Sequence, residues 1–271
     1  MCRLALAEGA IDAASFTIIR LISGILILVI AVNITSHNKQ TRSKGSWLAA
    51  SLLFVYAVAF SFGYISLDTG TGALILFGSV QISMIIASLV SGNRLHYSEW
   101  LGLFIAFAGF VYLIIPSLTT PSLMGFTLMT VSGVAWGCYT LVGRASTQAL
   151  SDTAYNFMRT APFVLILIIL TFKDANISAE GVLLAVLSGA ITSGVGYFVW
   201  YIALTGLSIT QAAVVQLFVP IIAAIGGVVF SNELITLRLV ESSCLVLGGI
   251  LIVILGRSTL ERKYSKVFGS E

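Results

Sequence analysis

The sequence has 271 residues, of which 58% are hydrophobic and only 9% are charged. A soluble protein carries roughly 25% charged residues because its surface faces water, so the composition excludes an ordinary soluble domain and predicts an integral membrane protein. The formal net charge of +3 is too small to indicate a nucleic-acid-binding surface, and we expect no nucleic-acid partner.

Nine long apolar segments follow one another along the chain. A helix needs about 20 mostly apolar residues to cross a hydrocarbon core of roughly 30 Å, and its backbone groups must be hydrogen-bonded within the segment. We predict membrane-spanning helices at residues 14–34, 47–66, 71–91, 98–116, 123–143, 154–172, 180–201, 208–230 and 238–256. The sequence therefore predicts an all-α polytopic protein of the plasma membrane, with the lipid bilayer as its surroundings.

The two halves of the chain are similar at an offset of 139 residues. Residues 79–82 (Ser-Val-Gln-Ile) align with residues 218–221 (Phe-Val-Pro-Ile), and Arg20 aligns with Arg159. Each match is weak alone, but several matches in the same order indicate an internal repeat.

The repeat divides the chain into residues 1–116, with four spans, and residues 117–271, with five spans and a short basic tail. The span at 123–143 opens the second repeat, and its partner would begin before residue 5. We therefore expect that the first repeat lacks its first helix. Either the start codon is misplaced or the chain is a nine-helix variant.

Lysine and arginine residues are unevenly divided between alternate connections. Nine of them lie in the tail and in the loops on its side of the membrane, and three lie on the other side. Because cytoplasmic loops carry an excess of Lys and Arg, we expect a cytoplasmic C-terminus. Arg94 aligns with Glu233 in the repeat, a change of sign that favours two repeats of opposite orientation.

Several of these features resemble the EamA-domain branch of the drug/metabolite transporter superfamily. The matching features are Pro220 in the fourth helix of the second repeat, the loop Asn232–Thr236 (Asn-Glu-Leu-Ile-Thr), the glycine-rich closing segment Leu247–Leu251, and Arg20 with Arg159 near the start of each second helix. The resemblance implies two inverted-topology repeats of about five helices, with ten helices expected and nine present. It also implies a permease or exporter of a small metabolite or amphipathic compound. The chain departs from the family pattern at Gln81, at Arg94 and in the missing helix.

Neutral polar and aromatic side chains are the main candidates for a substrate cavity. Amide and aromatic groups can orient an amphipathic solute in an apolar pocket. The deeper candidates are Tyr56, Gln81, Trp136, Tyr139 and Gln216. We expect the rings nearer to helix ends, Tyr64, Trp200 and Tyr201, to anchor at the membrane interface. Plain packing is the open alternative for the deeper residues.

Two arginines and a proline complete the candidate residues. Arg20 and Arg159 each lie near the start of a span, where they could reach the headgroups, contact a helix end or contact an anionic substrate group. Pro220 removes a backbone hydrogen bond within its helix and is a candidate hinge.

The sequence lacks the motifs of the main competing classes. We find no spacing of Cys, His or acidic residues that would bind a metal, and no serine-nucleophile or zinc-protease motif within a span. We therefore expect no metal, no cofactor and no enzymatic activity. The leading hypothesis is a secondary transporter with a small-molecule substrate and alternating access. A non-transporting or truncated membrane protein remains the alternative, and a homodimer is left open.

Overall fold

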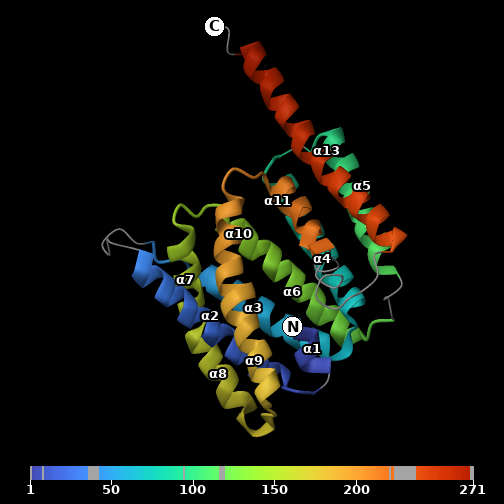
Figure 1. The fold of residues 1–271 in the computed structure, drawn as a ribbon. Coiled ribbons are helices and arrows are strands. Elements are labelled where there is room, and N and C mark those ends of the chain that lie inside the picture. Colours follow the sequence, from blue (N-terminus) through green and yellow to red (C-terminus); the bar gives the residue numbers. More distant parts are fainter. Residues whose placement is uncertain are drawn as a thin grey trace. The chain divides into compact units, whose positions relative to one another are not determined.

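The computed structural model describes residues 2–7, 9–35, 43–93, 95–115, 120–219, 221–222 and 236–268. The helices are α1 (Cys2–Ala7), α2 (Ala13–Thr35), α3 (Trp47–Ser66), α4 (Thr69–Val90), α5 (Tyr97–Ile114), α6 (Leu123–Gly143), α7 (Ala149–Arg159), α8 (Ala161–Thr171), η3 (Phe172–Asp174), α9 (Ala179–Leu187), η4 (Ser188–Val195), α10 (Gly196–Leu204), α11 (Ile209–Val215), η5 (Gln216–Phe218) and α13 (Leu237–Phe268) (Figure 1). Three sequence features, the predicted hinge Pro220, Arg94 and the loop around Glu233, lie outside these residues.

Eight of the described helical stretches are long and apolar enough to cross a membrane. The stretches Trp47–Ser66 and Leu123–Gly143 have the predicted bounds. The ninth predicted span, 208–230, is helical over Ile209–Phe218, and most of its remainder lies outside the described residues. The prediction of an all-α polytopic membrane protein is confirmed.

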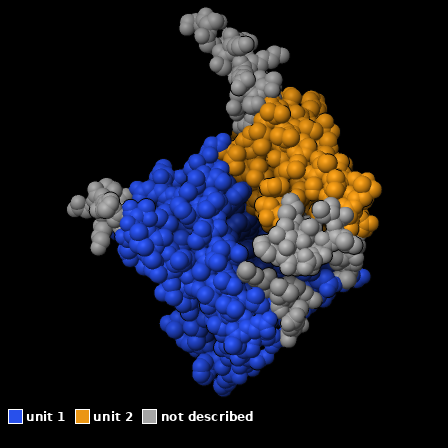
Figure 2. Space-filling model, viewed as in Figure 1, with its two compact units in different colours: residues 1–79, 119–206 blue, residues 80–118, 207–271 orange. Residues whose placement is uncertain are grey.

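The chain folds into two compact units that differ from the two predicted sequence repeats (Figure 2). Unit 1 comprises residues 1–79 and 119–206, and unit 2 comprises residues 80–118 and 207–271. Each unit thus takes segments from both halves of the sequence. The division into repeats at residue 116 stays a prediction, because compactness and sequence ancestry are different properties.

Glycine allows α2 to approach the π-helical segment η4 closely in unit 1. A Cβ atom on Gly189 would lie 2.0 Å from the carbonyl oxygen of Arg20 and 2.0 Å from Oγ of Ser23. Small residues permit such backbone approach where lipid supplies no hydrophobic force between helices. On another side of the unit, α3 packs against α6, and Ser132 Oγ donates a hydrogen bond to the Tyr56 carbonyl oxygen at 3.1 Å.

In unit 2, glycine likewise allows close backbone approach between α5 and α13, which lie side by side (Figure 1). A Cβ atom on Gly249 would lie 2.5 Å from the backbone nitrogen of Ala106 and 2.5 Å from the carbonyl oxygen of Gly102. The adjacent Gly248 has open space on its Cβ side. One face of α13 is therefore fixed by backbone contact with α5.

Candidate functional site

Arg20 on α2 carries a buried guanidinium group inside unit 1. The residue is only 4% exposed. Its Nε donates to Ser193 Oγ at 2.8 Å, and its Nη2 donates to the hydroxyls of Tyr56 at 3.2 Å and Tyr197 at 2.8 Å. Its Nη1 is buried and has no hydrogen-bond partner among the described residues. Of the three roles expected for Arg20, contact with the lipid headgroups is wrong, because the guanidinium group is buried and hydrogen-bonded inside the unit; contact with an anionic substrate group stays a prediction.

The three hydroxyl groups come from three separate elements of unit 1. Tyr56 lies on α3, Ser193 lies in the π-helical segment η4, and Tyr197 follows on α10. Segments of π-helix are uncommon and often occur at functional sites. The close approach of Gly189 to α2 places this segment within hydrogen-bond reach of Arg20.

Two aromatic rings lie close to the guanidinium group, and the Trp136 ring packs against its tyrosine partners. The ring centroid of Trp136 lies 4.9 Å from that of Tyr56 and 4.6 Å from that of Tyr197. The Cζ atom of Arg20 lies 5.5 Å from the ring centroid of Tyr56 and 5.4 Å from that of Phe60. Contacts of this kind stabilise a cation by about 0.5–2 kcal/mol. We call Arg20, Tyr56, Phe60, Trp136, Ser193 and Tyr197 the arginine cluster.

The arginine cluster holds a positive charge beside neutral groups. All three hydrogen bonds of the Arg20 side chain go to hydroxyl oxygens, and no described residue forms an ion pair with it. Burying one ion costs several kcal/mol, which neutral hydrogen bonds offset only in part. The site is therefore electrostatically suited to an anionic group that would pair with Arg20.

The structure brings together some of the predicted cavity residues and not others. Tyr56 and Trp136 belong to the arginine cluster, and Tyr139 stacks on Trp136 with ring centroids 5.6 Å apart. The other two candidates, Gln81 and Gln216, belong to unit 2. A role in substrate binding stays a prediction for all five.

The two glutamines make hydrogen bonds to nearby groups in unit 2. Gln81 Nε2 donates to the Ala213 carbonyl oxygen at 2.6 Å, while Gln81 Oε1 is buried without a partner among the described residues. Gln216 Nε2 donates to the Ala212 carbonyl oxygen at 3.0 Å and lies 3.4 Å from Met84 Sδ. The Gln81 amide thus joins α4 to α11, and the Gln216 amide contacts Met84 of α4.

Arg159 lies apart from the arginine cluster, at the end of α7. Its Nη1 donates a hydrogen bond to the Lys44 carbonyl oxygen, and its Cζ lies 5.4 Å from the Trp47 ring centroid. It therefore joins α7 to the segment that precedes α3. The two arginines that align in the sequence have different surroundings in the structure.

Sequence reasoning missed Ser193 and Tyr197 as partners of Arg20, and it misjudged two other rings. Tyr64 and Tyr201 are 6% and 1% exposed, so the expectation that they anchor at the membrane interface is wrong. The glycine-rich run Ser188–Gly196 was the available signal, because it allows close helix packing. The sequence could not show which helix would pack there.

A second group of polar residues in unit 1 holds the segment that precedes α3 against α7. Asp152 accepts hydrogen bonds from the Gly45 backbone nitrogen at 3.1 Å and from Ser146 Oγ at 2.5 Å. Asn156 Oδ1 accepts from the Ser46 backbone nitrogen at 2.9 Å. These residues line a small pocket of about 140 Å³, and the carboxylate already has several donors.

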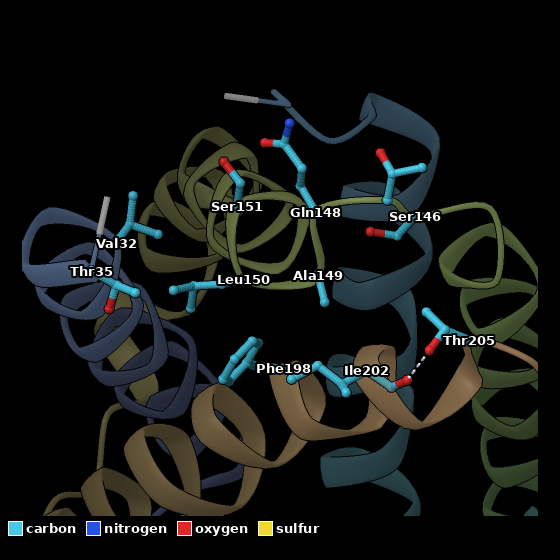
Figure 3. A pocket seen from close by; sticks show the side chains of 11 residues that line it. Val32, Thr35, Ser146, Gln148, Ala149, Leu150, Ser151, Phe198, Ile202 and Thr205 are labelled. Atoms are coloured by element: carbon cyan, nitrogen blue, oxygen red, sulfur yellow. Dashed lines mark hydrogen bonds between the residues drawn. The ribbon is translucent and has the colours of Figure 1, made fainter. Parts of the chain in front are cut away.

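A larger pocket of about 420 Å³ lies elsewhere in unit 1 (Figure 3). Leu150 and Ala149 of α7 lie opposite Phe198 and Ile202 of α10, with hydroxyl and amide groups around them. The described residues that line it are uncharged and include none of the predicted site residues. Nor do the described residues contain a cluster of His, Cys, Asp and Glu that could hold a metal ion. The arginine cluster is therefore the better candidate site.

The apolar helices and the arginine cluster define a multi-pass membrane protein with a polar site inside an apolar fold. Comparisons with known proteins show to which family of membrane proteins it belongs. Residues 123–255 match the EamA-like transporter family. A Pseudomonas aeruginosa relative named an uncharacterized protein is 43% identical over 264 residues, which cover 96% of this chain and 92% of the relative. The chain belongs to the EamA-like transporter family, whose members are membrane transporters rather than enzymes.

More distant similarities agree with this assignment. The aromatic amino acid exporter YddG of Escherichia coli is 23% identical over 228 residues, which cover 77% of this chain and 76% of the exporter. An uncharacterized transporter of Archaeoglobus fulgidus is 28% identical over 207 residues, covering 74% of this chain and 73% of the relative. One solved structure, titled only as the crystal structure of a protein, has the same fold. Its TM-score is 0.76 at 16% sequence identity, and the match covers 93% of this chain and 91% of that chain.

Proposed function

We propose that the protein is a secondary transporter that moves a small metabolite or amphipathic compound across the plasma membrane. Two inverted-topology repeats would alternate between inward-open and outward-open arrangements around a site near the middle of the membrane. The name of the Escherichia coli relative, an aromatic amino acid exporter, supports a small organic substrate. The basic tail favours a cytoplasmic C-terminus.

The observation that carries this proposal is the arginine cluster. An intramembrane charge is costly and usually marks a substrate pathway or a proton relay. Arg20 is buried, its Nη1 has no partner among the described residues, and the rings of Tyr56 and Phe60 lie close to it. A purely structural role would be served as well by an uncharged side chain, without the cost of burying an ion.

Counterflow in proteoliposomes tests the proposal. The purified protein is reconstituted, the vesicles are loaded with an unlabelled compound, and entry of the labelled compound is followed for a panel of amino acids, organic acids, amines and neutral aromatic compounds. We expect saturable counterflow with at least one class. Absence of flux with every class, by protein that is folded and monodisperse, would instead support a non-transporting membrane protein.

The side of the membrane on which the C-terminus lies needs a separate measurement, because substrate flux does not depend on knowing it. Fusions of a cytoplasmic reporter and a periplasmic reporter to the C-terminus are compared in cells. We expect activity from the cytoplasmic reporter alone. Activity from the periplasmic reporter would overturn the assigned orientation without affecting the transport proposal.

A further inference from the structure

We infer that the substrate is a monocarboxylate with an aromatic or apolar body and no ammonium group, and that its carboxylate binds Nη1 of Arg20. This inference rests on the proposed transport function and names the chemistry of its substrate. Four properties of the arginine cluster support it: the unused donors, the single charge, the partly exposed aromatic rings, and the lack of a partner for an ammonium group.

The unused donors of Arg20 are all on one nitrogen. A guanidinium group has five N–H donors, one on Nε and two on each terminal nitrogen. Nε donates to Ser193, and the two N–H groups of Nη2 donate to Tyr56 and Tyr197. The two N–H groups of Nη1 remain. An anion that binds Nη1 would therefore leave the existing hydrogen bonds of Arg20 intact.

The charge of the cluster limits the charge of the ligand. The hydrogen-bond partners of Arg20 are uncharged hydroxyls, so the site offers one positive charge. One carboxylate neutralises this charge through charge-assisted hydrogen bonds, which are about twice as strong as neutral ones. A dianion such as a phosphate monoester would leave a second charge buried without a partner.

The aromatic members of the cluster provide a surface for an apolar body. Phe60 and Trp136 are half-buried, whereas Tyr56 and Tyr197 are buried. Phe60 and Trp136 are therefore the members of the cluster with ring surface left for a ligand. An aromatic body on such a surface gains apolar burial and ring contacts of about 0.5–1.5 kcal/mol for each ring pair.

An ammonium group, as in an α-amino acid, lacks a partner in the cluster. Among the described residues, the hydrogen-bond acceptors of the Arg20 side chain are the hydroxyls of Ser193, Tyr56 and Tyr197, so each of these oxygens already accepts from a cation. The rings of Tyr56 and Phe60, which could attract a cation, already face Arg20. A second cation would also be repelled by the guanidinium itself.

A series of compounds of one shape tests the inference. Binding to the purified full-length protein is measured by displacement of radiolabelled 3-phenylpropanoate, with 3-phenylpropanoate, 3-phenylpropanamide and phenylalanine as competitors. We expect the amide and phenylalanine to bind at least about tenfold more weakly than the carboxylate, because a charge-assisted pair is lost or an ammonium is left unpaired. Binding of the amide or of phenylalanine as tight as that of the carboxylate, or failure of the carboxylate to bind, would overturn the inference.

Three variants locate the effect. Arg20→Gln should bind carboxylate and amide equally, and Arg20→Lys should keep part of the preference because it keeps the charge but loses the planar donor geometry. Arg159→Gln is the matched control and should keep the full preference, because Arg159 contacts a backbone carbonyl outside the cluster. An unchanged preference in a folded Arg20→Gln variant would overturn the inference. If that variant does not fold, the wild-type preference and the Arg20→Lys variant decide.

Flux separates this inference from the proposed function. Counterflow of a neutral or cationic compound, with no binding of 3-phenylpropanoate, would keep the transporter and overturn the carboxylate site. Arg20-dependent binding of 3-phenylpropanoate, with no flux for any compound, would keep the carboxylate site and overturn the transporter. Arg20-dependent binding together with counterflow of 3-phenylpropanoate supports both.

Discussion

The two compact units handle buried polar groups in different ways. In unit 1 the polar side chains around Arg20 bond to one another and come from helices far apart in the sequence. In unit 2 the glutamine side chains bond to backbone carbonyls of α11. Backbone partners are fixed by the helix itself, whereas side-chain partners can rearrange when a ligand binds. We therefore expect the side chains that rearrange on substrate binding to lie in unit 1.

Buried polar atoms without a partner among the described residues differ in kind between the units. Unit 1 has three, the Thr130 and Tyr139 hydroxyl oxygens and Nη1 of Arg20, of which only Nη1 belongs to a cation, and unit 2 has Oε1 of Gln81, an acceptor on a neutral amide. An unpartnered buried amide oxygen costs about 1–3 kcal/mol, and a charged group costs more. A carboxylate would satisfy Nη1 of Arg20 and be repelled by Oε1 of Gln81.

The largest expected effect comes from breaking the packing that forms the arginine cluster. Gly189→Ala places a Cβ atom 2.0 Å from the carbonyl oxygen of Arg20, so backbone must move, and we expect a loss of about 2–3 kcal/mol in unfolding free energy. Thermal unfolding in detergent, followed by helical circular dichroism, measures it. Gly196→Ala is the control, because its Cβ would have only an ordinary contact at 3.6 Å. Equal melting temperatures of the two variants would contradict the close approach.

Removing one hydroxyl from the cluster should have the next largest effect. Tyr197→Phe removes the acceptor that lies 2.8 Å from Nη2 of Arg20, and hydrogen bonds to charged groups contribute about 1.5–3 kcal/mol. We expect lower stability without ligand and partial recovery when 3-phenylpropanoate is added, because the anion compensates the charge. Melting curves with and without the compound measure both. A variant that is as stable as the parent would show that the hydroxyl does not hold Arg20.

The glutamines of unit 2 should give a smaller effect on stability. Gln216→Ala removes a hydrogen bond to the Ala212 carbonyl oxygen, which is worth about 1 kcal/mol. If Gln216 lines the cavity, as its sequence position predicts, the transport rate should fall by a larger factor than the yield of folded protein. Uptake is compared with the parent at matched expression. Equal uptake would remove Gln216 from the substrate site.

The smallest effect concerns the entry to α2 and depends on pH. Burial alone would raise the pKa of Asp12, but hydrogen bonds from the backbone nitrogens of Ser15 and Asn176 outweigh it and hold the pKa below its usual value. A carboxyl group with a lowered pKa stabilises the folded state above its unfolded pKa of about 4, and this contribution is lost as the pH falls through the folded pKa. Asp12→Asn leaves one acceptor oxygen where the carboxylate uses two, so it should cost about 0.5–1 kcal/mol at pH 7, the contribution of one hydrogen bond, and it should reduce the loss of stability between pH 5 and pH 3.

Melting temperatures of parent and variant over this pH range test the Asp12 prediction. Asp174→Asn is the control, because Asp174 lies in the exposed η3 segment. Parallel pH profiles for the parent and Asp12→Asn would contradict the assigned role of Asp12.

The sequence predicted much of the fold because hydropathy alone decides which segments enter lipid. The spans Trp47–Ser66 and Leu123–Gly143 match the structure residue for residue. The break between α7 and α8 at Thr160 and the π-helical segment Ser188–Val195 were not predicted. Both are local changes of backbone geometry that leave hydropathy almost unchanged.

The candidate site was predicted only in part, for a physical reason. Arg20, Tyr56 and Trp136 stand out as polar or aromatic residues within apolar segments. The partners Ser193 and Tyr197 are separated from Arg20 by 173 and 177 residues, and only tertiary packing brings them together. Residue type therefore indicates which side chains are unusual, whereas their pairing depends on which helices touch.

The most direct test of the account is an experimental structure of the protein with bound 3-(4-bromophenyl)propanoate, in which the bromine can be located by anomalous scattering. We predict that the carboxylate lies within hydrogen-bond distance of Nη1 of Arg20, that the bromophenyl ring contacts Phe60 or Trp136, and that the bonds to Ser193 and Tyr197 persist. A carboxylate bound away from Arg20, or a protein side chain that pairs with Nη1, would contradict the account.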